Sequence, residues 1–255
     1  MTEHCTNFGK LSDLGCAWRS EGEFELHAGG GFLRSETAKQ LTAGDGLVIE
    51  LEVSERVCLS LVACVRWIRV DDRVGPVGAW VDFHEPEGED QARIYACLRE
   101  NRGRVGPLLI RGVIERRCCL RRLSSARESR CMLYVGLSGR LEPGLAELFA
   151  RELDEHLCEM RERSSSLALF LDAGEFRPSP APSLDHVRRW LEILAAAVPL
   201  LGVLHGGGSV AMMQLSRIVR EAGVADSLMR VDEIDAARAT WTMLCDELAQ
   251  LSPVS

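Results

Sequence analysis

The segment Val57-Cys-Leu-Ser-Leu-Val-Ala-Cys-Val-Arg-Trp-Ile-Arg-Val70 decides the fold of the first half of the chain. It is rich in β-branched and aromatic residues, which favour strands, so one long strand is expected here. Leu47-Val-Ile-Glu-Leu-Glu-Val53 alternates apolar and polar residues, and Val77-Gly-Ala-Trp-Val-Asp-Phe83 follows a turn. Gly30 to Ser35 adds a short strand. The first hundred residues are therefore expected to form β structure, followed by a helix over 89–101, where the hydrophobic period changes.

The second half alternates apolar strand-like runs with amphipathic helical stripes. Strands are expected over 131–137, 166–172, 199–204 and 228–231, and helices over 144–161, 184–197, 209–222 and after Asp232. Ser183 and Ser209 each precede an expected helix, and their hydroxyls are predicted to cap it. Such an order predicts a mainly parallel or mixed sheet with flanking helices.

Composition excludes several classes of protein. The chain has 255 residues, of which 46% are hydrophobic, and its longest apolar run, Ile193 to Leu204, is interrupted by Pro199. A membrane span needs about 20 apolar residues, so none is expected. Met1 to Arg19 is polar and lacks a secretory signal. The ten cysteines form no C-x-x-C pair, which is typical of buried, reduced thiols. A soluble cytoplasmic protein is expected.

Motifs for catalysis are weak. The six histidines are scattered without metal-ligand spacing, and the glycines form no nucleotide-binding loop, so no metal or cofactor is expected. His205-Gly-Gly-Gly-Ser209 could supply backbone donors to an oxyanion. However, no serine lies in a G-x-S-x-G motif, and no histidine follows His205. The stretch is interpreted as a strand-to-helix turn capped by Ser209, and a serine hydrolase stays an alternative.

Charge is unevenly distributed. Between Arg102 and Arg130, nine arginines stand against Glu115 and Glu128, a net charge of +7, so the rest of the chain carries −15. Nucleic acid is not expected as a partner, because the stretch lacks interleaved aromatic residues for stacking and the remainder repels a polyanion. An interface between domains or an acidic protein partner is expected instead, through the following residues: Arg116, Arg117, Arg121 and Arg122.

Residues 22–103 resemble a PilZ domain, the bacterial receptor module for cyclic-di-GMP. The resemblance rests on Gly29-Gly-Gly-Phe-Leu-Arg-Ser35, on Leu41-x-x-Gly-Asp-Gly46, on Val65-Arg-Trp-Ile68 and on Val77 to Phe83, followed by a terminal helix. It implies a β-barrel with a terminal helix.

The ligand motifs of that family are degenerate here. The family has R-x-x-x-R upstream of D/N-x-S-x-x-G, whereas this chain has only Arg19 upstream, Glu25 for the Asp/Asn, His27 for the Ser, and a retained Gly30. The resemblance therefore implies that cyclic-di-GMP binding is lost. An alternative is a working receptor with an unusual site built from Arg19, His27 and the arginine-rich stretch.

Residues 117–250 resemble a STAS or SpoIIAA-like domain. Tyr134-Val-Gly-Leu-Ser-Gly-Arg-Leu141 matches the family's opening strand, Gly-Arg-Leu and helix, and Val231-Asp-x-x-x-Ala236-Ala-x-x-x-Trp241 matches its close. The family's regulatory serine lies in the loop after the strand that holds Leu171-Asp172. The usual D-S-S-G is absent, and Ser179 and Ser183 are the positional substitutes.

These observations predict an α+β protein of two domains. Residues 1–104 are expected to form the PilZ-like barrel and residues 117–255 the STAS-like α/β domain, with a connection near residues 103–116. Both families belong to bacterial signalling, and both ligand motifs have lost their diagnostic residues. The expected function is that of a non-enzymatic regulatory adaptor acting through protein–protein interaction, and a homo-oligomer is left open.

Overall fold

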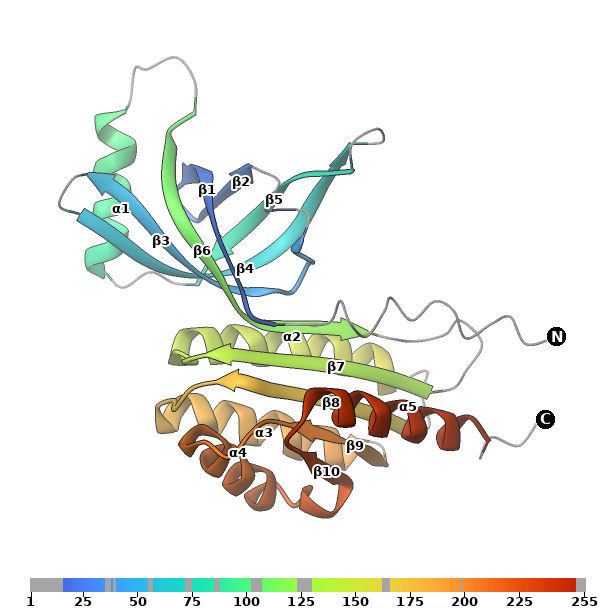
Figure 1. Cartoon of the computed structure of the whole chain (residues 1–255). Helices are drawn as coiled ribbons and strands as arrows, with labels where there is room; N and C mark the ends of the chain where they lie inside the picture. The colour runs from blue at the N-terminus through green and yellow to red at the C-terminus, as the bar shows by residue number, and fades with distance from the viewer. Residues whose placement is uncertain are drawn as a thin grey trace.

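The computed structural model describes residues 16–34, 38, 40–54, 57–71, 75–84, 88–101, 107–122, 130–161, 166–197 and 199–250. The first half is a closed antiparallel barrel of six strands in the order β1-β2-β5-β4-β3-β6, in which β6 pairs back with β1 (Figure 1). The strands are β1 (Trp18–His27), β2 (Gly30–Arg34), β3 (Gly46–Ser54), β4 (Val57–Asp71), β5 (Gly75–Phe83) and β6 (Leu109–Arg122).

The interior of the barrel is filled by the inward-facing residues of every strand. Leu47, Ile49 and Leu51 alternate along β3 and are all fully buried, as a half-buried strand requires. Helix α1 (Gly88–Glu100) adds Ile94 and Cys97 to the same core. The strands and the helix expected in this half of the chain are confirmed to within a few residues at each end.

Strand β6 belongs to both halves of the molecule. Its residues 109–116 pair with β1 and also contribute to the pairing with β3, whereas residues 118–122 pair with β7 (Arg130–Gly139). The prediction of a connection near residues 103–116 is therefore wrong for 109–116, which form a barrel strand. Ile110, Gly112 and Ile114 are buried at every second position, whereas Arg111 is exposed, and this alternation explains the strand.

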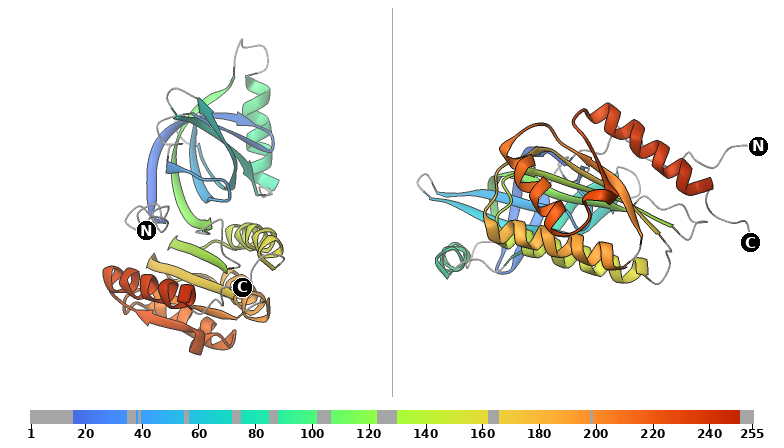
Figure 2. Two further views of the ribbon diagram at one scale, coloured as in Figure 1. Left: turned by 90° about the vertical axis from the view of Figure 1, so that its right-hand side faces the viewer. Right: turned by 90° about the horizontal axis from the view of Figure 1, so that it is seen from below.

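The second half is a sheet in which β7, β8 (Ser166–Phe176), β9 (Leu200–His205) and β10 (Leu228–Val231) run parallel. Helices α2 (Pro143–Arg161), α3 (Ala181–Ala197) and α4 (Val210–Glu221) cover one face, and α5 (Ile234–Gln250) covers the other (Figures 1 and 2). The described residues thus form an α+β structure with a six-stranded barrel, four further strands and five helices.

Two apolar layers pack against this sheet, one on each face. Trp190 of α3 is buried on the three-helix face, and Trp241 of α5 packs edge-on against Phe170 of β8 on the opposite face. Because β8 is covered on both sides, its run of apolar residues is continuous. No helix among the described residues is long and apolar enough to cross a membrane.

Of the two predicted helix caps, the one at Ser209 is confirmed and the one at Ser183 is wrong. Ser209 is the N-cap of α4, and its hydroxyl accepts a hydrogen bond from the Met212 amide (3.2 Å), as predicted. The prediction for Ser183 is wrong, because α3 begins two residues earlier, at Ala181. Ser183 lies inside the first turn, and its buried hydroxyl has no hydrogen-bond partner. Pro182 is the second residue of α3 and is compatible with the earlier start, since proline suits the first turn of a helix.

Candidate functional site

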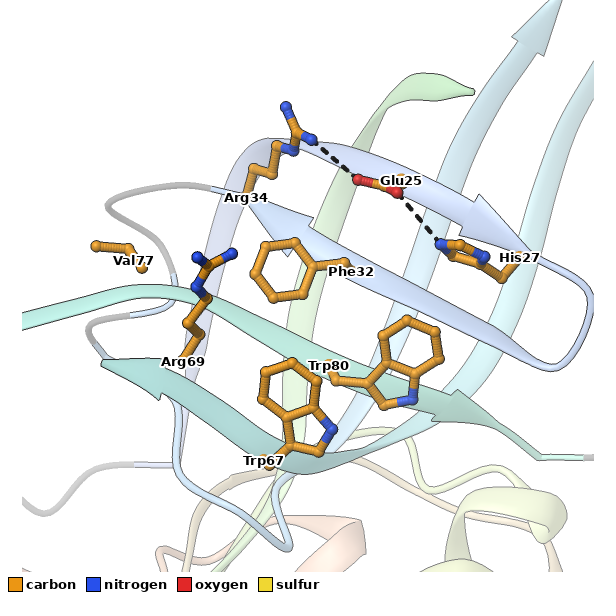
Figure 3. A pocket seen from close by; sticks show the side chains of 8 residues that line it. All are labelled: Glu25, His27, Phe32, Arg34, Trp67, Arg69, Val77 and Trp80. Atoms are coloured by element: carbon orange, nitrogen blue, oxygen red, sulfur yellow. Dashed lines mark hydrogen bonds and ion pairs between the residues drawn. The ribbon is translucent and has the colours of Figure 1, made fainter. Parts of the chain in front are cut away.

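A row of aromatic side chains crosses the outer face of the barrel. Phe32 of β2 lies opposite Trp80 of β5, and Trp80 lies opposite Trp67 of β4, so the three side chains come together on one face of three adjacent strands (Figure 3). The two indole planes are nearly parallel, 6° apart, with centroids separated by 6.2 Å, and the Phe32 ring lies 5.9 Å from Trp67. We call Phe32, Trp67 and Trp80 the aromatic row.

The aromatic row forms the floor of a shallow hollow of about 540 Å³. Trp67 has 47% of its surface exposed, although tryptophan is normally well buried. Phe32 and Trp80 are partly buried beside it, and an exposed tryptophan on an aromatic cluster suits an interaction surface. The indole of Trp80 is fixed in this position, because its Nε1–H donates to Asp82 (2.8 Å).

Two arginines border the hollow. Arg34 of β2 and Arg69 of β4 both lie opposite Gly78 of β5, one on each side of it. A Cβ atom at Gly78 would lie 2.1 Å from the Phe32 ring, so only glycine leaves room for that ring. Arg34 binds Glu25 (3.0 Å), whereas Arg69 has no ion-pair partner in the described part of the chain.

Of the four residues predicted at ligand positions, Glu25 and His27 line the hollow, whereas Arg19 and Gly30 do not. His27 Nε2 lies 3.4 Å from a carboxylate oxygen of Glu25, and the centroid of the His27 ring lies 5.2 Å from that of Trp80. Arg19 lies toward the other end of β1 and binds Glu115 (2.8 Å). Gly30 is packed so closely that a Cβ there would lie 2.2 Å from a backbone oxygen of β5.

Five residues of the hollow were not among the predicted site residues, although all of them lie in expected strands: Phe32, Arg34, Trp67, Arg69 and Trp80. The signal that could have found them is the alternation within each strand, which places these residues on the face opposite the core. Which of them meet depends on the register between strands.

Two of the arginines predicted as an interaction surface are engaged inside the molecule. Asp45 is fully buried and binds Arg121 through both carboxylate oxygens (2.6 and 3.1 Å). Arg116 reaches the same carboxylate at 3.4 Å and also donates to the backbone oxygens of Cys16 (2.9 Å) and Gln40 (2.8 Å). These arginines therefore lie between the barrel and the α/β layer and are not displayed at the surface.

The other two arginines of that set differ. Arg117 forms an ion pair with Glu115, which lies two residues before it on β6. Arg122 ends β6, and its side chain lies outside the part of the structure that is described. A second contact between the layers comes from Arg66 of β4, which binds Glu152 of α2 (2.5 Å) and Asp82 (2.8 Å).

The two candidate regulatory serines are buried. The Ser179 hydroxyl donates to the Arg177 carbonyl (2.9 Å) and accepts from the Leu141 amide (3.0 Å), and its backbone is bound on both sides by the Gln214 side chain. Ser183 lies within α3. A kinase would have to open this packing before either hydroxyl could be reached.

Among the residues that the structure describes, Ser138 and Ser209 do not form a catalytic arrangement with His205. The Ser209 hydroxyl caps α4, and the Ser138 hydroxyl donates to the Arg116 carbonyl (2.8 Å). Neither serine hydrogen-bonds to the His205 ring, as a nucleophile and its base must. Within the described residues, no group of three or more His, Cys, Asp or Glu side chains is arranged to hold a metal ion.

Comparison with known proteins adds little. No protein-family model matches the chain, and no curated protein matches it. Among solved structures, the siderophore-interacting protein from Acinetobacter baumannii shares 16% sequence identity, with 92% of this chain and 87% of that chain covered, at a TM-score of 0.25. A similarity at this level carries no argument about fold or function.

Proposed function

We propose that the protein is a non-enzymatic regulatory adaptor that recognises a protein partner through the aromatic row of its barrel. The observation that carries the proposal is the half-exposed Trp67, stacked parallel to the partly buried Trp80 beside Arg34 and Arg69. The few residues that dominate the binding energy of protein interfaces are enriched in tryptophan and arginine. The hollow is shallow and contains charges of both signs, as the rim of such an interface does.

The PilZ-like and STAS-like sequence motifs support a regulatory role, since both families are signalling modules. The free thiols among the described cysteines fit the reducing conditions of the cytoplasm. The contacts of Asp45 and Arg66 support a fixed arrangement of barrel and α/β layer, so a partner bound at the barrel is held in a defined orientation to the other half.

Cyclic-di-GMP is disfavoured as the ligand of the hollow. Glu25 lies at the position of the family's Asp/Asn and faces the hollow, where its carboxylate neutralises Arg34 and repels a phosphate. Arg19 is bound to Glu115 at a distance from the aromatic row. Titration calorimetry with cyclic-di-GMP is expected to show no binding in the micromolar range.

A nucleotide receptor is the second candidate function, and one observation favours it. The indoles offer stacking surfaces for a base, and Arg69 offers a guanidinium without an ion-pair partner in the described structure. Micromolar binding of cyclic-di-GMP that is lost in Trp67→Ser would establish this candidate and replace the protein partner.

The proposal is tested by affinity capture from the native host with the wild type, Trp67→Ser and Met243→Ser. Met243 is 61% exposed on α5 and serves as a matched control, because its substitution also removes a large exposed apolar side chain. A captured protein must then be purified and its affinity measured. We expect Trp67→Ser to cost about 2 kcal/mol of binding and Met243→Ser to leave binding unchanged. A partner that binds all three proteins equally contradicts the proposal.

A further inference from the structure

A second hollow, of about 530 Å³, lies at the carboxyl ends of the parallel strands β7, β8 and β9. This is the edge at which open parallel sheets bind their ligands, because side chains and loops from several strands converge there. The hollow is lined by the end of β8, by His205 at the end of β9, and by the residues that lead into α5. It is separate from the aromatic row, which lies on the barrel.

The His205 ring is held in a fixed orientation at this edge. Its Nδ1 lies 2.8 Å from Asp172 Oδ1, and that carboxylate also accepts from the Tyr134 hydroxyl (2.7 Å) and the Gly174 amide (3.1 Å). Burial, and after it the charge of Asp172, raise the pKa of Tyr134 far above its usual value, so the hydroxyl keeps its proton and remains a donor. Asp172 is thus available to His205 as an acceptor.

This arrangement fixes the chemistry of the other ring nitrogen. Because Nδ1–H donates to Asp172, the neutral imidazole has its lone pair on Nε2. His205 is about nine-tenths buried, with 9% of its surface exposed, and it lines the hollow. No hydrogen bond from Nε2 to another described residue is formed, and Nε2 is not one of the fully buried unpaired atoms, so it is accessible to a molecule in the hollow. An accessible acceptor in the wall of a hollow can bind a ligand that brings an N–H or O–H donor.

The charges of the lining residues indicate whether the donor group of a ligand is neutral or positively charged. Glu175 and Glu233 line it and have no ion-pair partner among the residues that the structure describes. Asp232 adds a carboxylate that is partly compensated by Arg230 (3.2 Å). The guanidinium of Arg238, also in the lining, is paired with an aspartate of its own helix (3.6 Å). The hollow therefore attracts a cation.

Apolar side chains complete the lining. Leu137 and Ile234 form part of the wall, together with Ala17. These groups suit a short aliphatic chain, whereas the acceptors above suit N–H donors. We propose that this hollow is a binding site for a small aliphatic amine, whose ammonium group donates to His205 Nε2 and is neutralised by Glu175 and Glu233.

The test is titration calorimetry of the full chain with 1,4-diaminobutane at constant ionic strength. We expect saturable binding to the wild type and about tenfold weaker binding to Glu175→Gln, since one charge-assisted hydrogen bond is lost. Glu155→Gln removes the same charge from an exposed position on α2 and is expected to bind as the wild type does. The uncharged analogue 1,4-butanediol is expected not to bind.

A second readout reports on His205 directly. In long-range ¹H–¹⁵N spectra, the Nε2 resonance, assigned by its loss in His205→Gln, should move toward the hydrogen-bonded range as the amine is added. Glu175 is exposed, so its substitution is expected to leave the fold intact. The proposal is overturned if no saturable binding occurs at millimolar amine, if the diol binds equally, if both glutamate variants weaken binding alike, or if Nε2 does not respond.

Discussion

Asp45 and Arg121 form a buried bidentate ion pair that joins the barrel to the α/β layer. Asp45 directly precedes β3 in the barrel, whereas Arg121 lies on the part of β6 that pairs with β7. Burial alone lowers the pKa of Arg121, but its hydrogen bond to Asp45 and the charge of that carboxylate raise it overall. The arginine-rich stretch therefore has an intramolecular anion at its centre.

Removing that anion should be costly. Asp45→Asn is expected to lower the free energy of unfolding by about 3–5 kcal/mol, because the guanidiniums of Arg116 and Arg121 lose their buried counterion. Urea unfolding measures the loss. Asp226→Asn, at an exposed aspartate of the 3-10 helix Ala225–Ser227, is the control and should change stability by less than about 0.5 kcal/mol. Equal stabilities for the two variants would show that the pair does not hold the layers together.

Arg66 and Glu152 make the second contact between the layers, and their coupling can be measured. A double-mutant cycle with Arg66→Met and Glu152→Gln is expected to give a coupling energy of about 1 kcal/mol or more, since the glutamate is buried and the pair is direct. Additive effects of the two substitutions would mean that the ion pair contributes nothing to stability.

Gly78 can be used to disturb the aromatic row without changing its members. In Gly78→Ala the new methyl group would overlap the Phe32 ring, so we expect a loss of about 1–3 kcal/mol in thermal or urea unfolding and weaker partner binding. Gly29→Ala is the matched control, because a Cβ there meets no atom within 4 Å. A Gly78→Ala variant as stable as the control would place the Phe32 ring elsewhere.

The cysteines are expected to differ in reactivity. Burial, and after it the charge of Glu152, raise the pKa of the Cys64 thiol to about 12. At pH 8 only about one Cys64 in ten thousand is then a thiolate, which is the reactive form. Cys58 is exposed. Alkylation of the native protein, followed by peptide mass spectrometry, should modify Cys58 at least about a hundredfold faster than Cys64, and denaturation should abolish the difference. Similar native rates would contradict the buried position of Cys64.

Most elements of the fold could be predicted, because their hydrophobic periods are long and regular. The two strands that close the barrel, β1 and β6, could not. Along β1 only Phe24 and Leu26 are fully buried, while Glu21, Glu23 and Glu25 alternate with them. In β6 the buried face carries Gly112 and Arg116 beside Ile110 and Ile114, so its apolar alternation is not visible in the sequence. Both strands are recognisable only through their mutual pairing, which joins residues far apart in the sequence.

The candidate site was predictable only in part. The family-like motif indicated Glu25 and His27, but Trp67 and Trp80 were read only as strand residues. Their meeting with Phe32 depends on the register of three strands, which is fixed by the buried faces and turns of the whole barrel. The hydrogen bond between Asp172 and His205 likewise arises from two parallel strands that are separated by a helix in the sequence.

The central claim, recognition of a protein through the aromatic row, is tested most directly by hydroxyl-radical footprinting of the purified complex. Trp67 is 47% exposed in the free protein, and Met213, Met229 and Met243 are exposed on the α/β layer and serve as internal references. Binding of the partner should protect Trp67 and Trp80 from oxidation and leave the three methionines unchanged. Protection of the methionines with unaltered oxidation of the two tryptophans would contradict the assignment.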